Sequence, residues 1–464
     1  MAFSGQLTAI AAAAVYVCLL AVIYVRRDKW PIYRLLTGRK ACIISFSTIL
    51  SLLLIFGLVP QDGGGDGLWG VLGFRAMKRS PVFIAALLLL ATSLSLNAIE
   101  DIHHFSRHRL GVTVSHLTLS IILLTGIFTG GTTVRAKLEA PSGLPVHTAS
   151  DERDGALRKL PFELTLSQFH IDSYASDLTV TLPDGSFYET TVAVNHPAKV
   201  GSWMIYQTDY RMSPEEGGAV SVFKCVYSPL SGVYDAILFL ILISAAAMAF
   251  FAGAGRSGDR RRYLVSILVS VVFIGICIIR PGVHTDGLLP ALRSPWLVPH
   301  ITAYIFAYTL MGIVTILALC ILWSTRRRKT GAPAAPESSP EPSSAAAALR
   351  RRPIPEGQLI SLCDRLVRIG WAFLTMGMVM GALWAKQAWG DWWAWDPKEV
   401  WAAVTWLSYL LYLHLRRNEG LDGGAGRAKR SAVVLLIVCF ALLQMCWWGV
   451  NLLPAAQGFS LHTY

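Results

Sequence analysis

The stretch Trp384–Trp406, WAKQAWGDWWAWDPKEVWAAVTW, holds seven of the fifteen tryptophans of the chain in 23 residues. Tryptophan is common where a membrane helix meets the lipid headgroups, because its ring is apolar and its indole N–H needs a polar partner. Such a belt accounts for two or three of the rings. Four more are crowded around Gly390 and Asp391, where the chain turns: Trp389, Trp392, Trp393 and Trp395. The stretch predicts a tryptophan-rich loop at the mouth of a membrane helix, with an interfacial belt as the alternative.

The residues after this loop have the pattern of a helix start. Asp396 is placed to cap the helix, Pro397 suits the first helical position, and Glu399 can reach back as in a capping box. We therefore expect a wide aromatic platform fixed on a rigid helix N-terminus. Rings of a flat apolar ligand could stack there, while Lys386 and Lys398 meet an anionic edge.

The composition is that of a membrane protein: 54% of the 464 residues are hydrophobic and only 15% are charged. Runs long enough to cross a bilayer, about 20 residues each, predict ten helical spans. They lie near 7–25, 41–59, 81–100, 111–130, 233–253, 263–280, 300–323, 362–385, 400–416 and 431–450.

The orientation follows from the connecting loops, because positively charged segments resist translocation. The basic loops, predicted to be cytoplasmic, are 26–40, 101–110, 254–262, 325–352 and 416–430, which hold 24 of the 41 lysines and arginines. Both termini and the tryptophan-rich loop then lie on the outer side, and the first span is interpreted as an anchor. The net charge of +12 is explained by these loops, so no nucleic-acid partner is expected.

Two sizeable segments lie outside the spans. Residues 132–232 alternate apolar and polar side chains, with a turn at Pro183-Asp184-Gly185, and predict an outer β-rich domain, for which a small sandwich is one arrangement. Residues 326–356 are rich in Pro, Ala and Ser and predict a flexible cytoplasmic linker. Of the eight cysteines, only Cys225 lies in the outer domain, and no pair has CxxC spacing, so we expect neither a disulfide framework nor a thiol-redox motif.

Four histidines are sorted by the topology into two layers. His116 in the fourth span and His414 in the ninth form an inner pair, while His300 and His462 form an outer pair on the side of the tryptophan-rich loop. A histidine in an apolar span is costly unless paired, so it marks a candidate site, although a bond to a neighbouring helix is the simpler alternative. Neutral imidazole is a good iron ligand, and two can bind haem axially. A zinc site is disfavoured, because two ligands do not close a tetrahedron.

Other histidines are assigned to the surface. His103, His104 and His108 are interpreted as solvated loop residues beside arginines, and His170 and His196 as surface or strand-end residues that could act as ligands only as an alternative.

The segment WGDWWAWDPKEVWA resembles the WWD signature of haem-handling proteins, and its WDPKE form is similar to that of system II cytochrome c synthases. Asn195-His196-Pro197 and the following Gly201–Gln207 are similar to the ResB (CcsB) family, as are the regions of Pro60-Gln61 and His116. From Tyr263 onward the chain resembles CcsA. The resemblance, over roughly 41–464, is to a natural CcsB–CcsA fusion, with a ResB-like part (1–255, including 132–232) and a CcsA-like part (256–464, including the linker 326–356 and the loop 384–401).

This resemblance implies a haem exporter and holocytochrome c synthase in the inner membrane of a bacterium. It would join the vinyl groups of haem b to the thiols of a CxxCH segment of apocytochrome c on the periplasmic side, supported by thiol-reducing partner proteins. By the resemblance, His116 and His414 would hold haem within the bilayer, and the outer site would hold it for attachment. The residues implied there are His300, His462, Trp389, Trp392, Trp393, Trp395 and Asp396.

Two other classes of function stay open at this stage. A haem transporter without ligase activity would bind haem but give no covalent product. A scaffold whose tryptophans only mark the membrane boundary would bind no haem.

Overall fold

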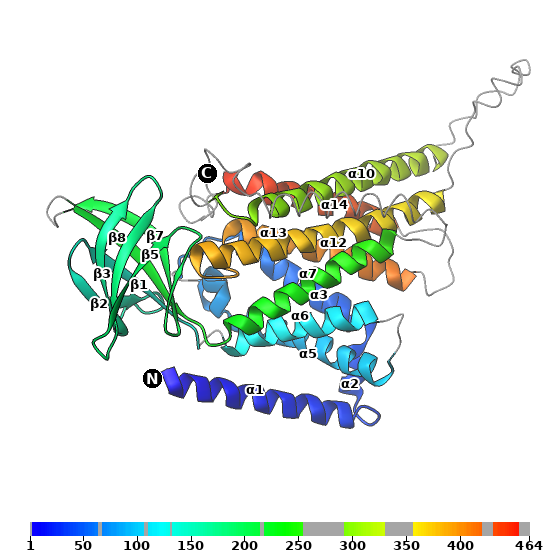
Figure 1. Ribbon diagram of the computed structural model, residues 1–464. Helices are drawn as coiled ribbons and strands as arrows, with labels where there is room; N and C mark the ends of the chain where they lie inside the picture. The colour runs from blue at the N-terminus through cyan, green and yellow to red at the C-terminus, as the bar shows by residue number, and fades with distance from the viewer. Residues whose placement is uncertain are drawn as a thin grey trace, which may run out of the picture.

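The computed structural model (Figure 1) describes residues 2–63, 67–105, 110–129, 132–213, 218–253, 292–329, 356–419 and 430–453. Long helices run side by side, and a β-rich domain caps one end of them. The long helices of the described ranges are α1 (Ala2–Val25), α3 (Arg39–Leu58), α5 (Pro81–His103), α6 (Leu110–Thr129), α7 (Ser231–Gly253), α10 (Leu297–Lys329), α12 (Glu356–Trp389), α13 (Pro397–Glu419) and α14 (Arg430–Trp447).

Eight of these helices are long and apolar enough to cross a membrane, which confirms a polytopic membrane protein with one β-rich domain. Their positions match the predicted spans, and the span predicted at 263–280 lies outside the described residues. The predicted span 400–416 forms α13, but this helix is too polar to be counted with the eight. Helix α13 is packed among the other helices of the protein, and its apolar side chains, such as Val404, Leu407 and Tyr409, are buried there.

Short helical segments join the long ones. They are α2 (Pro31–Thr37), α4 (Leu68–Val71), the 3-10 turn η1 (Phe74–Arg79) and the 3-10 turn η5 (Gly449–Leu452). Ser80 caps the start of α5, since its hydroxyl accepts a hydrogen bond from the Phe83 amide.

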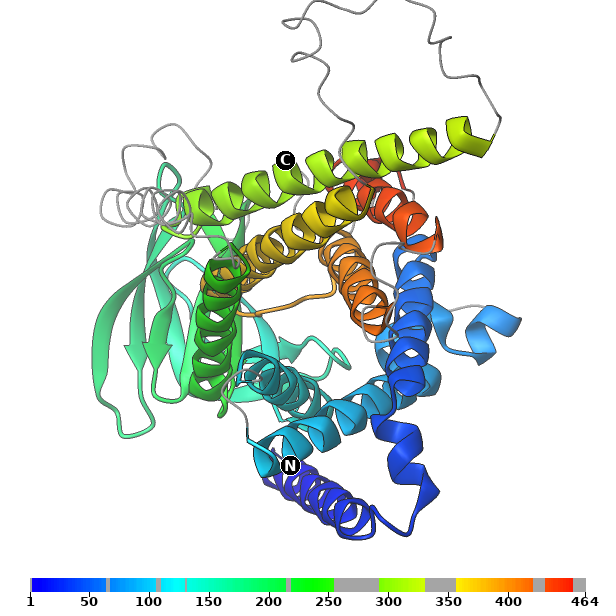
Figure 2. The same cartoon turned by 90° about the vertical axis from the view of Figure 1, so that its right-hand side faces the viewer.

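Six helices form a closed ring, in which each packs against the next: α3, α5, α6, α7, α12 and α13, which returns to α3. Figure 2 looks along this ring from the end opposite the β-domain. Helices α10 and α14 pack outside the ring against α12 and α13, and α1 lies at its edge beside α5 and α6. The ring therefore brings His116, on α6, and His414, on α13, into one helical assembly.

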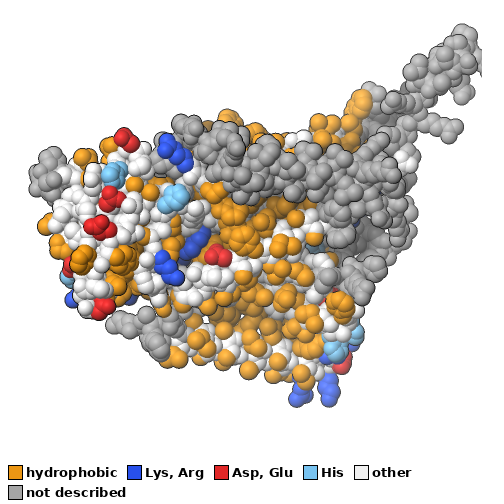
Figure 3. Space-filling view, in the orientation of Figure 1, with side chains coloured by type: hydrophobic (Ala, Val, Ile, Leu, Met, Phe, Trp, Pro, Cys, Tyr) orange, Lys and Arg blue, Asp and Glu red, His pale blue; other side chains and the backbone are white. Residues whose placement is uncertain are grey.

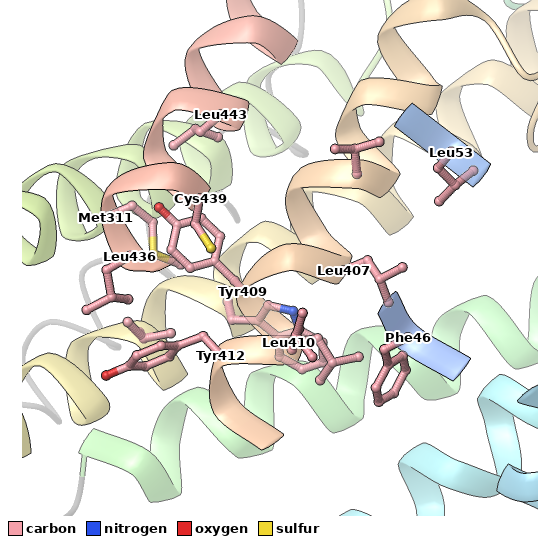
Figure 4. Packing of buried hydrophobic residues seen from close by; sticks show 14 of the residues in the cluster. Phe46, Leu53, Met311, Leu407, Tyr409, Leu410, Tyr412, Leu436, Cys439 and Leu443 are labelled. Carbon is pink, nitrogen blue, oxygen red and sulfur yellow. The ribbon is translucent and has the colours of Figure 1, made fainter. Parts of the chain in front are cut away.

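Helix α13 is the centre of the main hydrophobic core. Figure 4 shows Tyr409 of α13 beside Cys439 of α14 and Met311 of α10, and Leu407 of α13 near Phe46 of α3. The side chains of Tyr409 and Met311 are fully buried. Aliphatic and aromatic packing on two sides thus fixes the helix that begins at the tryptophan-rich loop.

The β-rich domain is a single antiparallel sheet of eight strands in the order β5-β4-β3-β2-β1-β8-β7-β6. The strands are β1 (Val134–Pro141), β2 (Pro145–Asp151), β3 (Leu157–His170), β4 (Ala175–Thr181), β5 (Phe187–Ala193), β6 (Ala198–Val200), β7 (Trp203–Ser213) and β8 (Gly218–Tyr227). The sheet rolls so that β5 approaches β6 and β7 around an apolar core. A sandwich of two separate sheets was therefore the wrong arrangement, because hydrogen bonding continues across all eight strands.

Local predictions in this domain are confirmed. The turn at Pro183-Asp184-Gly185 joins β4 to β5, with Gly185 at φ +84° and the Asp184 carboxylate accepting from the Ser186 amide at 2.9 Å. His170 ends β3 and bonds Asp177 at 2.7 Å, and His196 is exposed in the turn before β6. Cys225 is fully buried in the sheet, and burial raises the pKa of its thiol to about 12.

The types of side chain on the surface differ between the helical part and its two ends. On the face shown in Figure 3, the helical part is mostly apolar, while basic side chains gather where it meets the β-domain and again at the far end of the helices. The far end holds the first basic loop, residues 26–40, with α2 (Pro31–Thr37) in it. The end with the β-domain holds the loop between α12 and α13.

Candidate functional site

The tryptophan-rich loop, residues 390–396 between α12 and α13, has an unusual backbone. Gly390 has φ +82°, and a Cβ there would lie 2.8 Å from the ring of Tyr206 in β7. Trp395 has φ +62°, which is costly for a bulky residue and persists only where the surroundings fix it. Its ring is held between Phe56 of α3, stacked at 5.4 Å between centroids, and Phe83 of α5, at 5.6 Å.

A capping box anchors the loop to α13, as the sequence predicted. The Asp396 carboxylate accepts from the Lys398 amide at 2.8 Å, and the Glu399 carboxylate accepts from the amides of Asp396 at 3.1 Å and Ala394 at 2.8 Å. Asp396 is only 4% exposed. The first residues of α13 therefore fix the end of the loop through three short bonds.

We expect Asp396→Ala to remove the cap, destabilise the start of α13 by about 1 kcal/mol and release Trp395 from its strained backbone. The protein should accumulate in the membrane at normal levels, with bound haem and cytochrome c attachment reduced together. Trp393→Ala should act in the same way. The measurement is the haem absorbance of the purified protein and the covalent haem on a co-expressed cytochrome c.

Trp30→Ala is the control, since Trp30 precedes α2 at the opposite end of the helices and is 40% exposed. Equal damage from Trp30→Ala, or normal attachment in both loop variants, would mean that the tryptophans only mark a boundary.

The tryptophan rings of the loop point in different directions. Trp392 donates its indole N–H to Asp235 of α7 at 2.8 Å and packs on Tyr234, with the Lys386 ammonium 4.3 Å from its ring centroid. Trp393 and Trp395 are nearly perpendicular, at 86°. These rings form no single flat stack here, and their stacking against a ligand stays a prediction.

The loop also contacts the β-domain. The Asp391 carboxylate accepts from Arg135 Nε of β1 at 2.6 Å and from Lys224 Nζ of β8 at 2.7 Å. Burial by itself raises the pKa of the Asp391 carboxyl, but the charges and hydrogen bonds of Lys224 and Arg135 outweigh burial, so this pKa lies below its ordinary value. Asp391 is therefore ionised at neutral pH.

His300 lies between α10 and α12, on the loop's side of the fold. Its Nδ1 is 2.8 Å from the carbonyl oxygen of Gly377, and because a carbonyl only accepts, Nδ1 carries the proton. The lone pair is then on Nε2, the form in which imidazole binds iron. The ring is 6.0 Å from Trp384, which is 6.2 Å from Trp389. A series of aromatic ring contacts, through Trp384 and Trp389, thus connects His300 to the beginning of the loop.

Gly381 of α12 makes room for this histidine, because a Cβ at Gly381 would lie 2.7 Å from His300 Cε1. We expect Gly381→Ala to displace the His300 imidazole from its position against α12. Haem attachment should then fall by about tenfold, as is typical when a ligand loses a contact that orients it. Gly312→Ala on α10 is the control, since its Cβ would meet Phe440 only at 3.8 Å. Normal covalent haem in Gly381→Ala would show that the position of His300 does not matter.

His414, of the inner pair, has the same tautomer as His300. Its Nδ1 is 2.9 Å from the carbonyl oxygen of Leu410, so Nδ1 is the donor, and its ring lies 4.9 Å from that of Phe46 on α3. Two residues further, Arg416 binds Asp364 of α12, with Nη2 at 2.9 Å from the carboxylate. The inner end of α13 is therefore fixed against both α3 and α12.

His116 faces α5, where its Nδ1 is 3.9 Å from the carboxylate of Asp101. Asp101 is 3% exposed. Because α3 packs against α5, the two inner histidines face neighbouring helices of the ring. The helices that carry these histidines, α6 and α13, are separated in the ring by α5 and α3, and the joint binding of one haem by His116 and His414 stays a prediction.

A cavity that sequence reasoning missed lies where α6, α7, α12 and α13 meet. Its volume is only about 30 Å³, and its walls include Thr118, Met248, Trp371 and Trp406. The Trp371 indole donates to the Trp406 carbonyl at 3.1 Å, and the Trp406 indole donates to Thr375 Oγ1 at 2.8 Å. A tryptophan in each of two predicted spans was the available signal, but only the packing of four helices shows that they line one space.

The predicted site residues are thus distributed over two levels of the helices. His300, Trp389, Trp392, Trp393, Trp395 and Asp396 lie at the end with the β-domain, and His116 and His414 lie within the ring. His462, the second outer histidine, lies outside the described residues. Within the described ranges no three His, Cys, Asp or Glu side chains gather as a metal site.

Two family models match consecutive parts of the chain. The ResB-like family matches residues 103–231, which cover α6 and the β-domain, and the Cytochrome C assembly protein family matches residues 230–456, which cover α7 to α14 and the tryptophan-rich loop. Relatives named cytochrome c biogenesis protein CcsA align with the second part. One from Synechococcus sp. (strain JA-3-3Ab) is 32% identical over 277 residues, with 51% of this chain and 78% of the relative covered. The chain belongs to the cytochrome c assembly protein family.

Other CcsA proteins agree with this assignment. The relative from Synechococcus sp. (strain JA-2-3B'a(2-13)) is 29% identical over 281 residues, with 51% of this chain and 77% of the relative covered. The one from Prochlorococcus marinus (strain MIT 9301) is 31% identical over 252 residues, with 51% and 75% covered. This member of the cytochrome c assembly family joins a CcsA-like and a ResB-like part in one chain, as a CcsB–CcsA fusion does, and family membership supports a role in cytochrome c maturation.

Proposed function

We propose that the protein carries haem across a bacterial inner membrane and joins it to the CxxCH cysteines of apocytochrome c on the periplasmic side. The observation that supports this proposal is His300, whose Nδ1 lies 2.8 Å from the Gly377 carbonyl oxygen and whose ring lies 6.0 Å from that of Trp384. We propose that its Nε2 is an iron ligand. Membership of the cytochrome c assembly family supports haem and apocytochrome c as the substrates.

The proposed reaction adds each cysteine S–H across a vinyl C=C bond of haem. Sulfur bonds the carbon next to the porphyrin ring, the hydrogen goes to the terminal carbon, and no net oxidation occurs. The protein has to hold the vinyl groups and thiols in a reactive arrangement, which by itself supplies a large part of the rate enhancement. In this proposal, His300 and His462 ligate the iron axially, and the tryptophan-rich loop orients the ring edge.

The thiols of apocytochrome must be reduced before they react. The only cysteine of the outer domain, Cys225, is fully buried, and the raised pKa of its thiol leaves almost no thiolate at neutral pH. We therefore propose that a separate thiol-reducing protein supplies the reduced CxxCH segment.

Export is assigned to the helical ring. His116 on α6 and His414 on α13 would hold haem within the membrane before it reaches the outer site. The same arrangement would also suit a second function, that of a haem transporter without ligase activity, because moving haem through the helical ring does not require a cysteine-containing substrate.

The test is co-expression with a secreted peptide that contains CxxCH. Haem that stays on the peptide after denaturation supports the synthase, and the same peptide with both cysteines changed to alanine is the control. Haem in the purified protein without any covalent product would leave the transporter. Protein that purifies without haem would contradict both functions.

A further inference from the structure

The contact between the β-domain and the tryptophan-rich loop is built from charged side chains that come from the two family segments. Arg135 and Lys224 belong to the ResB-like segment, and Asp391 belongs to the cytochrome c assembly segment. The exposed fractions of the three side chains are 28%, 15% and 13%, so the cluster is largely shielded from solvent. A carboxylate held by two cations at 2.6 and 2.7 Å in such a setting is a strong and directional contact.

The strand register shows why these side chains meet. In the antiparallel pairing of β1 with β8, Arg135 is opposite Val226, and Lys224 is opposite Lys137. In the pairing of β7 with β8, Tyr206 is opposite Lys224. Alternation along a strand then places Arg135, Lys224, Val226 and Tyr206 on one face of three neighbouring strands.

This face forms a seat for the first two residues of the loop. The position of Gly390 is fixed by Tyr206 and Val226, since a Cβ there would come within 2.8 Å and 3.1 Å of their side chains. Asp391 follows directly and takes both cations. Trp392, the next residue, then reaches Asp235 of α7. The sheet therefore fixes the two residues that directly precede Trp392, and α7 holds its ring.

We propose that Arg135 and Lys224 are positioning residues for haem attachment, which hold the tryptophan-rich loop through Asp391. In the conformation that they hold, the Trp392 ring reaches Asp235 of α7. The inference rests on the proposed function, and it gives the ResB-like part a definite task in the chemistry of the CcsA-like part. A strained loop with positive φ at Gly390 and Trp395 needs such an external hold, because its own backbone does not favour this conformation.

The test uses the full chain with Arg135→Gln, Lys224→Gln and the double variant. We expect covalent haem on the CxxCH peptide to fall by roughly ten- to a hundredfold in the double variant, the range that a misplacement of about 1 Å can cause. Haem held in the protein should fall much less than covalent attachment, because the tryptophans of the loop and the inner histidines are all still present. Added imidazole should not restore attachment, because the iron ligands are present and the defect is one of orientation.

Two further variants provide a test if the glutamine variants do not reach normal levels in the membrane. Arg135→Lys retains a cation that can reach Asp391, and it should keep most of the attachment activity, whereas Asp391→Asn should match the double variant. Arg211→Gln is the matched control, because Arg211 pairs with Glu139 at 3.3 Å on the same sheet, with more than 40% of each side chain exposed.

Normal attachment in the double variant, its restoration by imidazole, or a loss in Arg135→Lys equal to that in Arg135→Gln would overturn the proposal. The wild-type chain separates the two levels of inference. If the wild-type protein gives no covalent product, the proposed synthase function is wrong. If the wild-type protein gives a product and the Arg135 and Lys224 variants give as much, only the positioning role is wrong.

Discussion

His300→Ala should reduce covalent attachment of haem by more than about tenfold, as expected when an iron site loses a ligand that its surroundings orient. The physical reason is the bond of Nδ1 to the Gly377 carbonyl, which leaves Nε2 as the nitrogen with the lone pair. His462→Ala is expected to have the same effect through the second axial position. Haem should still enter both variants, but its iron should be oxidised more easily. The measurement is covalent haem on the co-expressed CxxCH peptide, with the reduced and oxidised spectra of the protein.

Imidazole distinguishes a missing ligand from a damaged fold. Added to either variant, it should partly restore attachment, because a small ligand can occupy the vacated position. His170→Ala serves as a control on the β-domain, where His170 bonds Asp177 of the neighbouring strand at 2.7 Å. Unchanged cytochrome c yield in both variants would contradict the assignment of the outer pair.

The second large effect is expected at the inner pair. His116→Ala and His414→Ala should each give nearly colourless protein, because haem that is not held within the ring does not reach the outer site. His116 lies against Asp101 of α5 and His414 lies against Phe46 of α3, and these two helices pack against each other. The measurement is the ratio of haem absorbance to protein absorbance after purification.

His103→Ala is the matched control for the inner pair. His103 lies in the last turn of α5, close to Asp101 in the sequence, but its side chain is exposed and contacts Tyr24 and His104. It should purify with normal colour. Full haem in His116→Ala and His414→Ala would show that these two histidines have a structural role only.

The sequence was sufficient for the local features of this protein. Apolar runs and basic loops place the membrane helices and their ends, because the cost of exposing backbone or charge to lipid leaves few alternatives. The start of α13 was equally determined, since Asp396, Pro397 and Glu399 satisfy the first amides of the helix from within four residues. The positions of His170, at the end of β3, and of His196, in the turn before β6, also agree with the sequence.

Only the tertiary structure decided how distant segments meet. The sequence predicted the tryptophan-rich loop as a platform, but Trp392 is drawn to Asp235 on α7 while Trp395 packs between Phe56 and Phe83, so the directions of the rings depend on helices elsewhere in the chain. The rolled single sheet could not be told from a sandwich, because alternation along a strand does not specify which strands pair.

The bond between Arg135 and Asp391 joins residues 256 positions apart, and no local pattern marks either as a partner. Likewise, Gly381 was an ordinary apolar-span residue in the sequence, and only the packing of α10 on α12 shows that its missing side chain makes room for His300. The sequence by itself determined which residue types are available at each end of the membrane. Which of them touch was decided by the packing of helices and strands, because short-range contacts between distant segments depend on the register of every element between them.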